Sequence, residues 1–135
     1  SPMTNLLLPG RAINMGGGWE TRRKREPGND WIILQLGAAG TVTFAEIDTN
    51  HFKGNFPDSF SLEATHQPGV SQEAFLESEP IWVPLIAQTK LNAHEQKRFR
   101  SEISPHNPIT HVRLNIFPDG GISRLRLYGL KSEAP

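Results

Sequence analysis

A dense group of chemistry-bearing residues lies between Asp48 and Asn55. This eight-residue stretch holds a carboxylate (Asp48), an imidazole (His51), an ammonium (Lys53) and a side-chain amide (Asn55). A carboxylate beside a histidine can fix the tautomer of the ring, and the histidine can then move protons near neutral pH. The alternative is an Asx-type turn, in which Asp48 and Asn50 cap backbone amides. The spacing alone leaves both interpretations open.

A second group begins at Trp19 and continues through a run of basic residues to Arg25. Glu20 can orient one of the arginines that follow it, or act as an acid or base. Arg22 offers a planar fork suited to a carboxylate or a ureido oxygen. A run of cations is more often a solvated surface, and that alternative also stays open. The preceding Gly16–Gly18 lacks the context of a phosphate-binding loop and indicates a flexible bend.

A third group of polar side chains alternates with apolar ones near the end of the sequence. Two alternating runs flank the turn Pro118–Gly121, a pattern that predicts a β-hairpin. The hairpin would place its polar side chains on one face, suited to a carboxylate and amides. The alternative is the solvated outer face of an antiparallel sheet. These side chains are His111, Arg113, Asn115, Arg124 and Arg126.

The sequence contains no pattern that predicts a metal site. The chain has no cysteine, so disulfides and thiolate ligands are excluded. Its five histidines form neither an HxH nor an HExxH pattern. His94-Glu95 is not followed by the second histidine that a zinc protease needs. We therefore expect no bound metal.

The sequence predicts that the three groups of polar residues are carried by many short strands. Eleven prolines and twelve glycines interrupt the sequence, and no long helical pattern is present, which is typical of a β-sandwich or barrel. A phase shift between Phe44 and Ala45 predicts a bulge or burial on both sides, Pro84 predicts an edge strand, and Trp31 and Trp82 are predicted in the core. We expect strands at 31–36, 41–48, 60–65 and 81–87, a turn at 37–40, a loop or insertion at 67–79, and no clear element at 91–104.

Composition limits the class of protein. The 135 residues fit one domain, and fourteen basic residues balance fourteen acidic ones, a poor match for nucleic acid. The apolar stretches are too short to span a membrane, and no signal peptide is evident. We expect a cytoplasmic protein, because a cysteine-free chain suits a reducing compartment. Residues 1–9 are predicted as an N-terminal extension or expression remnant, and residues 10–135 as the domain.

Several of these segments resemble the allantoicase family in order and spacing, from about Gly10 to Gly129. The resemblance implies an all-β fold, a jelly-roll β-sandwich similar to galactose-binding-like domains. It also implies hydrolysis of allantoate to ureidoglycolate and urea in purine and allantoin breakdown, with a small ureide substrate and no organic cofactor. The matching segments are Gly18–Arg23, Asn29–Trp31, Leu36–Gly37, Ile47–Thr49, His51–Pro57, Thr110–Gly121 and Arg124–Arg126.

The resemblance, together with residue chemistry, implies roles for individual side chains. His51 and Glu20 are the acid/base candidates, with Asp48 orienting His51. A substrate carboxylate or ureido oxygen would be bound by Lys53, Arg113 and Arg124. The further substrate-binding candidates are Trp19, Arg22, Asn55, His111 and Asn115.

The number of repeats departs from the family pattern. Allantoicases usually carry two tandem copies, and one is present here. The chain is then a fragment of a longer enzyme, a single repeat that pairs with itself, or a repeat that has lost catalysis. We expect a homo-oligomer or pairing with a second repeat. The alternative function is a non-catalytic galactose-binding-like domain for ligand binding or structure, which exposure of Trp19 on a concave rim would favour.

Overall fold

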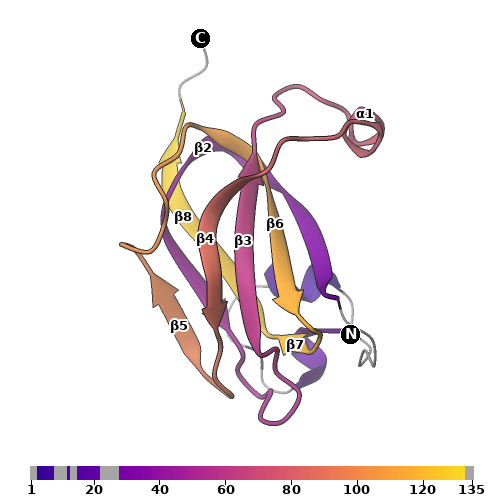
Figure 1. The fold of residues 1–135 in the computed structure, drawn as a ribbon, viewed down its shortest axis with the longest axis vertical. Helices are drawn as coiled ribbons and strands as arrows, with labels where there is room; N and C mark the ends of the chain where they lie inside the picture. Colours follow the sequence, from indigo (N-terminus) through magenta and orange to yellow (C-terminus); the bar gives the residue numbers. More distant parts are fainter. Residues whose placement is uncertain (1–2, 8–11, 13–14, 22–27, 133–135) are drawn as a thin grey trace.

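The computed structural model describes residues 3–7, 12, 15–21 and 28–132, and antiparallel strands dominate it (Figure 1). The only α-helix in these ranges is α1 (Gln72–Glu77), and Met3–Leu7 and Met15–Gly17 form short 3₁₀ helices. The predicted all-β class is therefore confirmed. The strands are β1 (Trp19–Glu20), β2 (Asp30–Asp48), β3 (Ser59–Thr65), β4 (Val83–Lys90), β5 (Gln96–Phe99), β6 (Ile109–Phe117), β7 (Gly121–Ile122) and β8 (Arg124–Lys131).

The long strand β2 belongs to both layers of the sandwich. Its first half, Asp30–Gln35, pairs with β6, and the sheet continues through β3 to β4. Its second half, Gly40–Asp48, pairs with β8 and with β5. The register shifts between Gln35 and Gly40, where β2 bends from one layer to the other (Figure 1). Gly40 suits this bend because an added Cβ would overlap the carbonyl of Leu130.

A single hydrophobic core fills the space between the layers. Phe60 on β3 meets Phe99 on β5 edge to face, with ring centroids 5.3 Å apart. Met3–Leu7, within the residues predicted as an extension, contributes the buried Leu6. This packing is that of a jelly-roll β-sandwich. Other members of the core include Val42, Ala45, Ile47, Leu62, Ala64, Leu85, Ile86, Val112, Leu114, Ile116 and Leu125.

Most of the predicted elements are present. The strands predicted at 31–36 and 41–48 are parts of β2, and the turn predicted between them at 37–40 is absent. That prediction is wrong because β2 runs through the glycines as one strand. The strand at 60–65 is confirmed as β3, and the strand at 81–87 overlaps β4, which lies at an edge of its sheet. The bulge is confirmed by a register shift between Val42 and Phe44. The insertion at 67–79 contains α1, and the undecided segment at 91–104 contains β5.

The predicted hairpin between the last two long strands is wrong. β6 and β8 do not pair with each other, because each pairs with a different half of β2. The segment between them forms β7, which pairs with β1. Arg113 therefore lies on the outer face of the β3–β6 layer, while Arg124 lies in the other layer. The alternating pattern identified two half-buried strands, but it carries no information about their partners.

The prediction of buried tryptophans is also wrong for Trp31. Its side chain is 57% exposed on the outer face of β2, whereas its neighbour Ile32 points into the core. Trp82 precedes β4, is half-buried and packs under the guanidinium of Arg113. Both tryptophans lie outside the core between the layers, and Trp19 lies within it.

Candidate functional site

Three segments converge at the end of the sandwich that carries β7, the lower end in Figure 1. They are β1, the loop between β2 and β3, and the turn before β7. The backbone N–H of Thr21 donates to the Gly120 carbonyl (3.0 Å), and the N–H of Gly121 donates to the Asn55 carbonyl (2.8 Å). Backbone hydrogen bonds thus fix the positions of the side chains that β1 and the loop present. We call this region the loop end.

Glu20 and Asn55 form the central contact of the loop end. The amide Nδ2 of Asn55 donates a hydrogen bond to Oε2 of Glu20, and both residues are half-buried. Glu20 stands opposite Gly121 in the β1–β7 pair, so its backbone is fixed as well. A carboxylate oriented by an amide donor is suited to proton transfer with a bound molecule. The structure brings together these two predicted residues, which lie far apart in the sequence.

Phe52 anchors the loop that carries Lys53 and Asn55. Its ring is fully buried, and its backbone N–H donates to the Thr49 carbonyl (2.9 Å). Gly121 lies directly against this ring, because an added Cβ would be 2.5 Å from the Phe52 Cζ. The loop folds around this anchor and leaves Lys53 exposed to solvent. The exposed ammonium of Lys53 is therefore available to an anion, in the same loop that carries Asn55.

The prediction that Asp48 orients His51 is wrong. The ring Nε2 of His51 lies 2.6 Å from the carbonyl oxygen of Ala12, and among the described residues no hydrogen bond joins it to Asp48. Asp48 Oδ1 instead accepts from the backbone N–H of Asn50 (2.7 Å), which is the Asx-turn alternative. His51 has a positive φ of 74°, and its own N–H donates to Nδ1 of His94 (2.8 Å).

Arg124 binds the N-terminal segment rather than the loop end. It is buried, and its Nη1 donates to the carbonyls of Gly17 and Asn5, the latter at 3.0 Å. Burial lowers the pKa of Arg124, the charge of Arg126 lowers it further, and Asp48 opposes this effect. These contacts direct the guanidinium to backbone oxygens, so a substrate carboxylate would have to displace them.

A second polar cluster lies on the outer face of β3 and β6. Arg113 contacts Oε2 of Glu63 through Nε (2.7 Å) and Nη2 (2.5 Å), and its guanidinium lies 4.5 Å from the Trp82 ring centroid. Asn115 Nδ2 donates to the same Glu63 oxygen (3.2 Å) and to Ser61 Oγ (3.3 Å). We call these five residues the Glu63 cluster. Its cation is already paired, so Arg113 is not a vacant carboxylate site.

Glu63 was not predicted as a site residue, although the sequence contains a signal for it. Polar residues alternate in β3 at Ser59, Ser61, Glu63 and Thr65, and β3 pairs directly with β6. The register places Glu63 opposite Arg113. The strand predicted at 60–65 carried no prediction of its partner, so the contact between Glu63 and Arg113 was not expected.

The remaining predicted residues have separate environments. His111 stacks on Phe75 of α1, with centroids 4.1 Å apart, and burial lowers its pKa. Trp19 is only 7% exposed, so it is not the exposed rim aromatic that would favour sugar binding. Arg22 lies outside the described residues.

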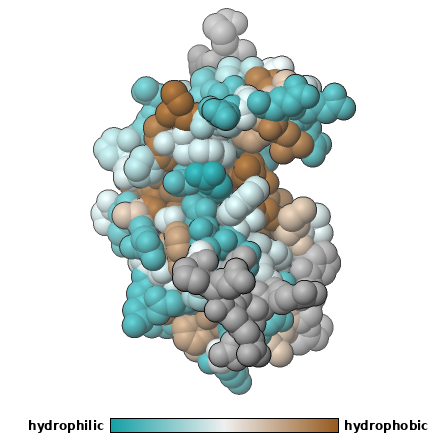
Figure 2. Space-filling view, turned by 45° about the vertical axis from the view of Figure 1, so that its right-hand side comes forward, coloured by the Kyte–Doolittle hydropathy of each residue, from teal (hydrophilic) through white to brown (hydrophobic). Residues whose placement is uncertain are grey.

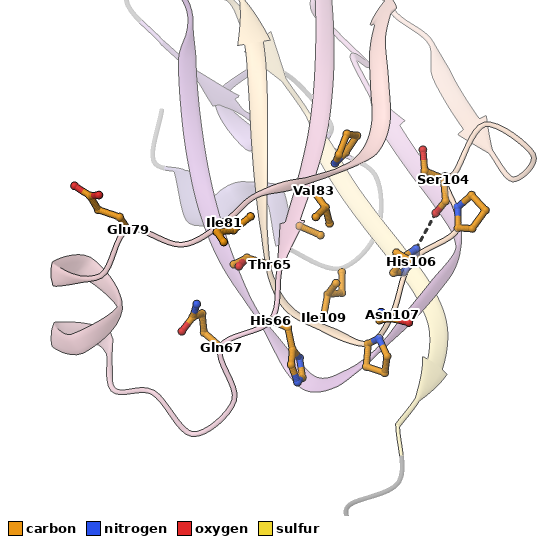
Figure 3. Close-up of a pocket in the computed structure, with 14 residues that line it drawn as sticks. Thr65, His66, Gln67, Glu79, Ile81, Val83, Ser104, His106, Asn107 and Ile109 are labelled. Atoms are coloured by element: carbon orange, nitrogen blue, oxygen red, sulfur yellow. Dashed lines mark hydrogen bonds between the residues drawn. The ribbon is translucent and has the colours of Figure 1, made fainter.

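A hollow of about 740 Å³ lies at the opposite end of the sandwich, beside the insertion that carries α1 (Figure 3). Its wall includes Thr65, Gln67 and Asn107, and none of the predicted site residues lines it. His106 is held there by two backbone groups, with Nδ1 donating to the Ser104 carbonyl (2.9 Å) and Nε2 accepting from a backbone N–H (3.0 Å). This hollow and the acid/base candidates are therefore at different ends of the sandwich.

Within the described ranges, no three His, Asp or Glu side chains are grouped so that they could hold a metal ion. None of the helices in the described part is long and apolar enough to cross a membrane.

Comparison with known proteins identifies the family. The model of the allantoicase repeat matches residues 1–132. The chain belongs to the allantoicase family. A probable allantoicase of Pseudomonas aeruginosa (strain LESB58) is 54% identical over 128 residues, which cover 94% of this chain and 38% of that protein. The chain thus spans less than two-fifths of this relative's length.

Solved structures agree with the fold. The crystal structure of allantoicase from Saccharomyces cerevisiae superposes with a TM-score of 0.81 at 35% identity, covering 96% of this chain and 37% of that one. An F5/8 type C domain from Bacteroides fragilis has a TM-score of 0.61 at 16% identity, covering 94% and 80%. The second match shows the fold alone, and it confirms a sandwich of the galactose-binding-like type.

Proposed function

We propose that this chain is one repeat of an enzyme that hydrolyses allantoate to ureidoglycolate and urea. The observation that carries the proposal is the Glu20–Asn55 pair in a member of the allantoicase family, with the exposed Lys53 in the same loop as Asn55. Relatives of this chain are named allantoicases, including the yeast protein of known structure. We also propose a cytoplasmic location, as expected for a cysteine-free chain.

The reaction replaces a nitrogen by an oxygen on one carbon and requires two proton transfers. A C–N bond to the departing urea breaks, a C–O bond from water forms, the urea nitrogen gains a proton and the water loses one. A single carboxyl group can supply the first proton and accept the second. Glu20 takes this role in our proposal, because Asn55 fixes one of its oxygens.

The other side chains of the loop end contribute binding and a second acid/base candidate. Lys53 attracts the substrate carboxylate, since Arg113 and Arg124 already have partners. His51 donates from Nε2 to the Ala12 carbonyl, which leaves its Nδ1 as a proton acceptor. We keep His51 as the second acid/base candidate, acting without help from Asp48.

The test is urea release from allantoate by the wild type and two variants. We expect Glu20→Gln to lower the rate by about 100-fold or more, the usual loss for a general acid/base. The matched control is Glu79→Gln, which changes an exposed carboxylate at the other end of the sandwich. Full activity in both Glu20→Gln and His51→Ala would refute the assignment of roles.

The length of the chain calls for a second protein in this experiment. Because the chain spans less than two-fifths of its relative's length, the active site in our proposal is completed by a second repeat. A tandem fusion of two copies is therefore assayed beside the single chain. A folded protein that releases no urea in either form would contradict the proposed activity and favour a non-catalytic domain.

A further inference from the structure

The layer made of β4, β3, β6 and the first half of β2 has two edges (Figure 1). At one edge, residues 31–35 pair with β6 on one side. β5 and β8 pair with β2 only from Gly40 onward. Among the described residues, no strand therefore lies along the outer side of residues 31–35.

The opposite edge, β4, has features that discourage pairing with another chain. Pro84 removes a backbone donor, and the register with β3 shifts twice along the strand. Lys90 adds a charge at its end. Proline, irregular register and lysine are the devices by which natural sheets protect an exposed edge.

Beyond Asp30, its first residue, the edge of β2 lacks these devices. Residues 31–36 read Trp-Ile-Ile-Leu-Gln-Leu, without a charge, a proline or a glycine. Trp31 is 57% exposed, and the core-facing Leu34 and Leu36 are only partly buried. An uncharged, apolar edge of this kind is a template for pairing with another strand.

The surface beside this edge is apolar or charge-paired. Ile33 and the 69% exposed Leu76 border a hollow of about 290 Å³ under α1. Figure 2 shows brown side chains below the helix, next to a teal group on the sheet. The charges nearest to Ile33 in the register, Arg113 and Glu63, neutralise each other. A face whose charges are paired internally can meet an identical face without repulsion.

We propose that the free edge of β2 pairs in antiparallel fashion with the same edge of a second copy of this chain. A two-fold axis near Ile33, the centre of the segment, would place each Trp31 beside Gln35 of the second copy. The two layers would then form one continuous sheet, and Leu34 and Leu36 would be covered. The matching family model describes a repeat, so a sandwich of the same kind is a natural neighbour.

The test is the mass of the 135-residue chain by sedimentation equilibrium over a concentration series. We expect a dimer, twice the 15.1 kDa of one chain. Ile33→Lys places a charge on the edge and is expected to give the monomer mass. The matched control is Val83→Lys on the protected edge, which is expected to stay dimeric. If Ile33→Lys fails to fold by circular dichroism, Gln35→Lys, at an exposed position of the same edge, replaces it.

Hydrogen exchange locates the interface independently. Amides within residues 31–35 are expected to exchange more slowly as the protein concentration rises, and amides of β4 are expected to be unaffected. A wild type that stays monomeric throughout the series would overturn the proposal, even if it associates with a different sandwich. A dimer that persists in the folded edge variant would also overturn it. Neither readout involves catalysis, so a failure here leaves the proposed activity untouched.

Discussion

The contact between Gly121 and Phe52 provides a sharp test of how the loop end is built. An added Cβ at Gly121 would be 2.5 Å from Cζ of the fully buried Phe52 ring, closer than real Cβ atoms approach other atoms. The backbone at Gly121 does not have the positive φ that favours glycine. The effect of Gly121→Ala should therefore come from steric overlap with this ring.

The size of the effect follows from the packing. Overpacking a buried site costs about 1–3 kcal/mol, so Gly121→Ala should lower the melting temperature by roughly 4–12 °C, at about 4 °C per kcal/mol for a domain of this size. Phe52→Ala alone should cost about 3–5 kcal/mol because it leaves a cavity. In the double variant the alanine at 121 no longer meets a ring, so its cost should largely vanish.

Denaturant unfolding of the wild type, both single variants and the double variant gives the coupling. We expect the double variant to be at least about 1 kcal/mol more stable than the sum of the two single effects predicts, as for residues in contact. Urea release should fall in Gly121→Ala as well, because the displaced ring carries Asn55 away from Glu20. Additive effects on stability would refute the reasoning.

Three further predictions concern other parts of the structure. Burial lowers the pKa of His111, so the folded protein should lose stability as the pH falls from about 6.5 through this lowered value; in His111→Phe, unfolding at a series of pH values should show a weaker loss. Arg113→Ala removes the cation paired with Glu63 and should lower the free energy of unfolding, measured with urea, by about 1–2 kcal/mol, more than Arg113→Lys does. Arg124→Lys replaces the fork that binds two N-terminal carbonyls and should speed proteolytic cleavage before Trp19.

The sequence predicted the strands better than their partners. Proline, glycine and alternation located β3, β4 and the bulge in β2 because these signals act over a few residues. The turn at 37–40 was wrong because glycine can also mark a strand that bends between layers, as at Gly40. The hairpin was wrong because the pairing of β6 and β8 depends on β2, a strand far away in the sequence.

The candidate site was predictable where it rests on residue type. Glu20 and Asn55 were identified, and the structure brings them into contact. The partner of His51 was not predictable, because it is the backbone carbonyl of Ala12, 39 residues away in the sequence. The same holds for Arg124, whose partners are backbone carbonyls that no side-chain motif can reveal.

The position of ligand binding tests the central claim most directly, and it can be measured on the single chain and on the tandem fusion of two copies. Allantoate is titrated into the isotope-labelled chain while backbone amide resonances are followed by NMR. We predict that the largest shifts occur at Glu20, Asn55 and Gly121, at the loop end. Shifts confined to Thr65, Gln67 and Asn107, around the hollow at the opposite end, would contradict the account.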